Sequence, residues 1–159
     1  MTQIEDDKAL LAKIEEQEKR LVFDGFTLEM GLKLGLDLVK IASAENFPIA
    51  IDITRNGQQV FHSVLSGTSP DNDAWITRKT AVVQRFGHSS LYMGVACQLS
   101  GISLEDKYLL PPNTYAAHGG AFPITLRHSG VIGAVCVSGL PQMDDHALVV
   151  KVIEDMLAL

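Results

Sequence analysis

The dipeptide Asn56-Gly57, set between two runs of alternating apolar and polar residues, is the feature that most constrains the fold. Asn-Gly in this setting is the strongest short-range signal for a two-residue β-hairpin turn, because both residues tolerate a positive φ. Such a turn pairs Ile51 with His62. It then predicts one shared face of the hairpin that carries Ile49, Ile51, Ile53, Val60, His62 and Val64, with His62 as a hydrogen-bonded core histidine.

A second hairpin is predicted in the run AFPITLRHSGVIGAVCVSG. Phe122, Ile124 and Leu126 alternate with more polar positions, which is typical of a strand. The following segment, 131–138, is apolar on both faces and is expected to be a central strand. A turn at Ser129-Gly130 would place Gly120 opposite Gly139 and His118 opposite Pro141.

Helical spacing of apolar residues predicts helices before, between and after these hairpins. A fifth strand is possible, and it would be short. Strands joined by tight turns, with helices before and after them, indicate an α+β fold in which helices pack on an antiparallel sheet of about five strands. The expected helices are 3–22, 28–45, 70–86, 90–99 and 141–159, and the possible extra strand is Lys107–Leu110.

The helix 28–45 is apolar around more of its circumference than one sheet face can cover. Gly31 and Gly35, four residues apart, favour tight packing on the sheet over a dimerisation motif. The remaining apolar row predicts a homo-oligomer, at least a dimer.

Composition excludes several classes of function. The net charge of −6 and pI near 5.2 argue against binding to nucleic acid or to anionic membranes, because both need a basic surface. Cys97 and Cys136 have neither disulfide-framework nor zinc-site spacing, and we find no signal peptide or apolar span. A cytoplasmic protein is expected, with a peripheral helix in 1–24 and a single domain in 25–159.

The open ends of both hairpins are expected at one edge of the sheet, if strand 47–54 lies antiparallel to strand 131–138. Loops on a rigid scaffold are where binding sites occur, and glycines there allow close approach of a ligand. The residues at this edge that offer stacking area, charge or hydrogen bonds form the predicted ligand site: Asn72, Trp75, Arg78, Lys79, Tyr115, His118, Gly119, Gly120, Asp145 and His146.

Several of these residues also have a structural interpretation. Gly119 and Gly120 can form a bulge, and Trp75 can anchor a helix to the sheet. Acids in a first helical turn interact with the helix dipole. No metal is expected, because no spaced ligand motif is present, but His118, Asp145 and His146 would be its ligands.

Four motifs carry a resemblance to a known family: NDAWITRK, SSLY, YAAHGGAFPI and VSGLPQMDDH. Together with the glycine-rich hairpin they resemble the haem-degrading-domain superfamily of HbpS-like and GlcG-like proteins, in a cytosolic branch with no settled activity. The resemblance covers roughly residues 27–157. It implies a profilin-like sheet, assembly into dimers or higher rings, and haem as the candidate cofactor, although the sequence has no dedicated axial-ligand motif.

Three hypotheses about function follow. The favoured one is an oligomeric, non-catalytic protein that binds a small ligand at the loop edge, with a relation to haem or iron. The second is an oligomeric adaptor or chaperone-like module for protein partners. The third is a metal-assisted enzyme that uses His118 and His146, which are expected at the same edge of the sheet.

Overall fold

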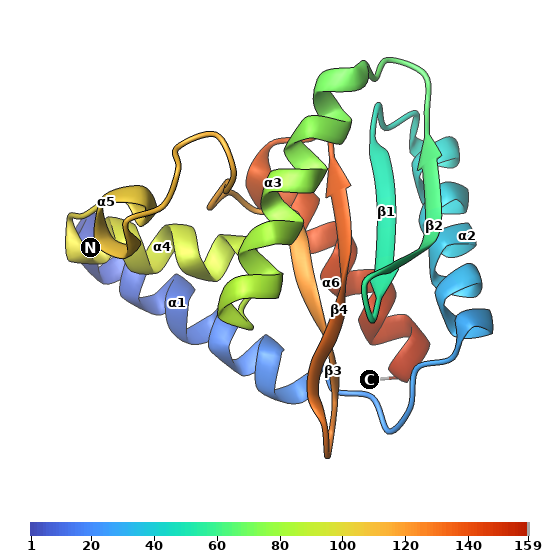
Figure 1. The fold of residues 1–159 in the computed structure, drawn as a ribbon, viewed down its shortest axis with the longest axis horizontal. Coiled ribbons are helices and arrows are strands. Elements are labelled where there is room, and N and C mark those ends of the chain that lie inside the picture. The colour runs from blue at the N-terminus through green and yellow to red at the C-terminus, as the bar shows by residue number, and fades with distance from the viewer. Residues whose placement is uncertain (159) are drawn as a thin grey trace.

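The computed structural model describes residues 1–158 and has the predicted α+β architecture, with helices on an antiparallel sheet (Figure 1). The described part of the chain holds four strands rather than five. In chain order the elements are α1 (Gln3–Arg20), α2 (Leu28–Glu45), β1 (Ala50–Arg55), β2 (Gln58–Val64), α3 (Pro70–Phe86), α4 (Ser90–Ser100), α5 (Leu104–Tyr108), β3 (Ala121–Leu126), β4 (Gly130–Ser138) and α6 (Gln142–Leu157).

The predicted short strand at Lys107–Leu110 is wrong, because this segment contains the end of helix α5. The Ser103 side chain caps that helix by accepting a hydrogen bond from the backbone N–H of Asp106. Leu109 then takes a left-handed conformation and ends the helix.

The first hairpin turns at Asn56-Gly57, as predicted, with φ values of 51° and 77°. Its predicted register is wrong, because a β-bulge leaves Val60 without a partner on β1, so Asp52 pairs with His62. A shift of one residue moves a side chain to the other face of a sheet. His62 therefore lies beside Asp52 and not on the isoleucine face.

The second hairpin also differs in register from the prediction. Three residues, 127–129, join Leu126 to Gly130, and a bulge follows, so Phe122 rather than Ile124 pairs with Val135. Loops of this length are common in hairpins. Gly120 consequently accepts the backbone hydrogen bond of Val137 instead of lying opposite Gly139. This shift is two residues, so each side chain keeps its predicted face.

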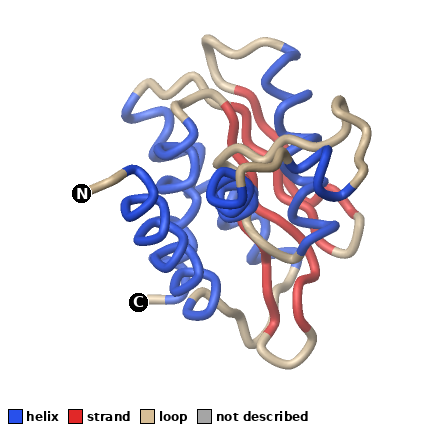
Figure 2. Tube along the Cα trace, turned by 90° about the vertical axis from the view of Figure 1, so that its left-hand side faces the viewer, coloured by secondary structure: helices blue, strands red, loops and turns tan. Residues whose placement is uncertain are grey.

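Helices cover both faces of the sheet, whose strand order is β2-β1-β4-β3 (Figures 1 and 2). Helices α2 and α6 bury the main core against one face, and α3 packs on the other. Gly31 and Gly35 lie against the side chains of Val60 and Phe61, which confirms their predicted packing on the sheet. Helix α1 packs on α4, beside the sheet. The division of the chain at residue 24 stays a prediction.

Strand β1 runs antiparallel to β4, as predicted. The end of β4, the beginning of β3 and the first turns of α3 and α6 therefore meet at one edge of the sheet, the upper edge in Figure 1. The opposite edge carries the two hairpin turns. This topology positions the candidate site.

Candidate functional site

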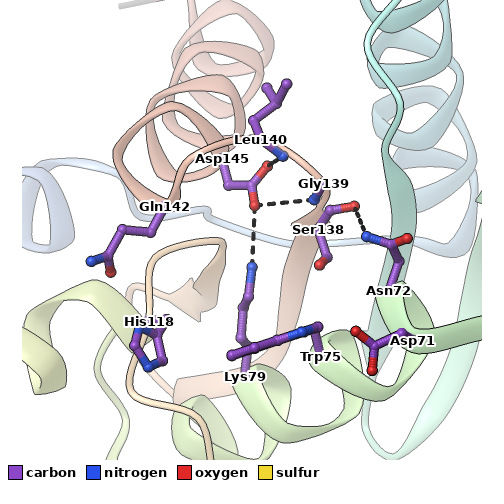
Figure 3. A pocket seen from close by; sticks show the side chains of 10 residues that line it. All are labelled: Asp71, Asn72, Trp75, Lys79, His118, Ser138, Gly139, Leu140, Gln142 and Asp145. Carbon is purple, nitrogen blue, oxygen red and sulfur yellow. Dashed lines mark hydrogen bonds and ion pairs between the residues drawn. The ribbon is translucent and has the colours of Figure 1, made fainter. Parts of the chain in front are cut away.

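A pocket of about 260 Å³ opens at this edge, between α3, the end of β4 and the first turns of α6 (Figure 3). Five of the predicted site residues line it: Asn72, Trp75, Lys79, His118 and Asp145. The other lining residues are Asp71, Ser138, Gly139, Leu140 and Gln142. We call this the Lys79 pocket.

Lys79 and Asp145 form a buried ion pair in this pocket. Their side chains are 4% and 2% exposed, and the Lys79 Nζ lies 3.2 Å from Asp145 Oδ2. Nζ also donates to the carbonyl of Val137. The carboxylate accepts from Nζ and from the backbone N–H groups of Gly139 and Leu140 (Figure 3). Each charge is thus paired and hydrogen-bonded, which a buried ion pair requires.

Burial raises the pKa of the Asp145 carboxyl, and the Lys79 ammonium and the two N–H donors oppose that rise. The pair joins α3 to the beginning of α6 and to the end of β4. It therefore holds three elements in fixed positions around the pocket.

Trp75 and His118 form the aromatic wall of the pocket. Their rings meet edge to face with centroids 5.4 Å apart, and the Arg78 guanidinium lies 4.2 Å from the indole centroid. Burial lowers the pKa of His118, and the charges of Lys79 and Arg78 lower it further. A neutral imidazole offers one hydrogen-bond donor and one acceptor.

Arg78 and Tyr115 line an adjacent pocket of about 280 Å³, which shares Trp75 and His118 with the first. Gly119 donates its backbone N–H to the side chain of Gln142, so this hydrogen bond connects the segment that carries His118 to the beginning of α6. Gly120 lies against Lys79 and the Val137 carbonyl and has a φ of 142°.

His146 lies outside the Lys79 pocket. The residue is 5% exposed, its Nε2 lies 2.8 Å from the Gln17 side-chain oxygen on α1, and its ring packs on Phe122. Burial lowers the pKa of His146 to about 4. Consecutive helical residues leave the axis about 100° apart, so Asp145 and His146 face different surroundings.

The conditional metal set of His118, Asp145 and His146 is not assembled. No group of three His, Cys, Asp or Glu side chains is placed to hold a metal ion anywhere in residues 1–158. The physical reason is that Asp145 is satisfied by Lys79 and two backbone N–H groups, while His146 faces α1.

Lys79 and Asp145 were both predicted as site residues, but their ion pair was not predicted. One signal was available: Ile76, Lys79 and Val83 follow helical spacing on the face of α3 that packs on the sheet, and all three are buried. A lysine in an apolar row needs a buried partner. Ser138 ends β4, Gln142 begins α6 and Leu140 lies in the loop between them, and they were missed because no local pattern indicates the conformation of this connection.

Among residues 1–158, no helix is long and apolar enough to cross a membrane. Both cysteines, Cys97 and Cys136, are unpaired and buried.

Comparisons with known proteins identify the family. The model of the family described as haem degrading protein HbpS-like matches residues 26–154. The UPF0303 protein of Streptomyces coelicolor is 51% identical over 144 residues, which cover 91% of this chain and 91% of that protein.

Solved structures agree. The crystal structure of the Ybr137w protein is similar with a TM-score of 0.85 and 34% identity, over 93% of this chain and 87% of that one. The PduOC:heme complex has a TM-score of 0.68 at 15% identity, over 81% of this chain and 93% of that one, and supports the fold alone. The chain therefore belongs to the HbpS-like family of haem-degrading proteins.

Proposed function

We propose that this chain is a homo-oligomeric protein that binds a small ligand in the Lys79 pocket. The observation that carries the proposal is the Lys79–Asp145 pair, in which two charges are almost fully removed from water beside an open pocket. Burying an ion pair adds little stability over apolar packing, so its place beside a pocket favours a functional role. Family membership supports small-ligand binding as well.

The lining indicates the chemistry of the ligand. Trp75 supplies a flat stacking surface, and the neutral His118 ring with the amides of Asn72 and Gln142 supplies donors and acceptors. Among the described residues that line this pocket, Lys79 is the one cation, and Asp145 compensates its charge. We infer a small, flat, polar molecule without a strong negative charge.

Haem is the group that the family name implies, and one solved structure with a similar fold is described as a heme complex. The Lys79 pocket does not fit it. Its volume of about 260 Å³ is below the range of about 300–1,000 Å³ for drug-sized ligands. The lining is largely polar, and the one imidazole is packed against Trp75. We therefore do not propose haem as the ligand of this pocket.

Native mass spectrometry of untagged protein tests the proposal. The wild type is expected to retain a small molecule, and the double variant Trp75→Ala/His118→Ala is expected to lose it. His128→Ala is the control, because His128 is exposed in the far hairpin loop. Wild type without a retained molecule, or equal retention by both variants, would contradict the assignment.

Oligomerisation is proposed from the outer face of α2. Leu28, Leu32 and Leu36 recur every four residues there and are 45%, 51% and 53% exposed. A row of large exposed side chains at this spacing is typical of a helix that packs on another protein surface. A second copy of the chain is the partner we propose.

We predict that the wild type is at least a dimer at micromolar concentration. The double variant Leu32→Gln/Leu36→Gln should have a lower mass in solution, because its oligomer dissociates. Glutamine keeps the helix propensity while it removes apolar area. Light scattering measures the result, with Ile102→Gln, another exposed apolar residue, as control. A monomeric wild type would disprove the prediction.

The other two hypotheses have less support. If the leucine variant leaves the oligomer intact, the α2 row favours the adaptor or chaperone-like alternative. The metal-assisted enzyme loses its basis, because His118 and His146 have separate surroundings. The two unpaired cysteines agree with the cytoplasmic location that we propose.

A further inference from the structure

A second pocket, of about 420 Å³, lies between α3 and the β1–β2 hairpin. We call it the His62 pocket. The β-bulge at Val60 creates it, because the bulge turns His62 away from the isoleucine face and toward α3. The two pockets share no lining residue.

Two carboxylates flank the His62 ring in this pocket. Nδ1 lies 3.2 Å from Asp52 Oδ1, and Nε2 lies 3.3 Å from Asp73 Oδ1. Gln59 donates a hydrogen bond of 2.6 Å to Asp52. Asp52 is 6% exposed, and burial raises its pKa while Gln59 and His62 oppose the rise. The pocket therefore concentrates hydrogen-bond acceptors and negative charge.

Two buried hydroxyl groups in the same pocket lack partners. Thr80 is 7% exposed and its Oγ1 has no hydrogen-bond partner, and the same is true of the buried Oγ1 of Thr54, within residues 1–158. The Cys136 thiol beside Thr80 is at most a weak partner. A buried hydroxyl without a partner lowers stability, so these two groups favour a role in hydrogen bonding to a ligand.

We propose that the His62 pocket binds a small organic cation with a primary ammonium group. An ammonium has three donors and no acceptor, which complements two carboxylates and two unpartnered hydroxyl oxygens. The described side chains contain no three-residue set suited to a metal ion, which favours an organic cation. In the proposed complex the ammonium lies beside the His62 ring and donates to the carboxylates of Asp52 and Asp73, and the hydroxyls of Thr54 and Thr80 accept from the rest of the ligand.

Two probes of nearly equal size test the proposal by chemical-shift titration of the labelled protein at neutral pH. Ethanolamine carries the ammonium, and ethylene glycol replaces it with an uncharged hydroxyl. We expect saturable shifts around His62 with ethanolamine at millimolar concentration and an affinity at least about tenfold weaker for ethylene glycol, because hydrogen bonds between charged groups are about twice as strong as neutral ones. Equal affinities, or no saturation with ethanolamine, would overturn the proposal.

Variants separate binding from folding. Asp73→Asn removes a charge from a partly exposed side chain and is expected to weaken ethanolamine binding at least about tenfold, since a lost charged hydrogen bond is worth that much. Asp155→Asn, an exposed aspartate on α6, is the matched control and should bind like the wild type.

Thr80→Val makes the sharper comparison. Valine has the same shape and removes an unpartnered buried hydroxyl, so the melting temperature without ligand should stay the same or rise. Ethanolamine binding should nevertheless weaken several-fold. A variant that binds as well as the wild type would show that the hydroxyl contacts no ligand and would count against the proposed site.

Discussion

Replacing Lys79 with methionine is expected to lower the free energy of unfolding by about 3–5 kcal/mol at neutral pH, the usual cost of removing one partner of a buried ion pair. Methionine fills a similar volume, but it leaves Asp145 in the interior without its counter-charge. Urea unfolding measures the effect. Lys151→Met is the matched control, because Lys151 pairs with Asp155 on the surface, where ion pairs contribute little.

The free energy of unfolding that the variant Lys79→Met loses should depend on pH. Burial already raises the pKa of the Asp145 carboxyl, and without Lys79 the pKa rises further. Below the unfolded-state pKa of about 3.9, both states hold the proton and the carboxyl adds no penalty. As pH increases, ionisation favours the unfolded state more than the folded one, so the variant loses stability up to its raised folded-state pKa. A loss that is equal at pH 4.5 and pH 8 would contradict this account.

A second substitution checks the cause. Asp145→Asn in the Lys79→Met background removes the uncompensated charge and keeps one side-chain oxygen, which can accept from one of the N–H groups of Gly139 and Leu140 that the two carboxylate oxygens bind. The double variant should therefore be more stable than Lys79→Met at pH 8, and its stability should vary less with pH. If the double variant is the less stable of the two, packing rather than charge explains the loss.

Sheet topology was predictable because its signals are local. Asn56-Gly57 makes a turn wherever alternating strands flank it, and the apolar segment 131–138 is long enough to pair on both sides. These two features were sufficient to place the open ends of the hairpins at one edge. They did so although both registers were predicted incorrectly, since a register shift does not move the open end of a hairpin.

The registers were not predictable, because bulges depend on packing. Val60 and Phe61 are both apolar and both contact α2, so no alternation marks the extra residue. The consequence was large for His62, which moved to the face of Asp52, and small for β3, where a shift of two residues preserved the faces.

The candidate site was predictable as a location and not as a set of contacts. Trp75, Lys79 and His118 were predicted from their expected place at the edge and from their side-chain chemistry, and the Lys79 pocket contains all three. His146 was predicted to lie with them. It follows Asp145 by one residue on α6, however, and its side chain therefore points toward Gln17 and not into the pocket. The rotation of a helix about its axis is set by its whole apolar face, here including Val149 and Ile153, and not by the residues at its beginning.

Gly120→Val is expected to disrupt the site and to lower the free energy of unfolding. At a φ of 142°, a β-branched residue is strained, which costs about 1–3 kcal/mol. An added Cβ would also lie 2.5 Å from the Val137 carbonyl oxygen and from the Lys79 Nζ. Overpacking of this kind costs about 1–3 kcal/mol more, so we expect a total loss of about 2–6 kcal/mol in the free energy of unfolding. Ser129→Ala, in the exposed far loop, should change it by no more than about 0.5 kcal/mol.

A comparison of two alanine variants separates strain from crowding. Gly57 also has a positive φ, but an added Cβ there meets no atom within 4 Å. Gly57→Ala therefore reports backbone strain, while Gly120→Ala reports strain together with the displacement of the Lys79 ammonium from the Val137 carbonyl. We expect Gly120→Ala to be the less stable variant by about 1–3 kcal/mol and to lose ligand retention, which Gly57→Ala should keep. Equal unfolding free energies in urea would mean that the chain moves aside at Gly120, and that the close approach of this glycine does not position Lys79.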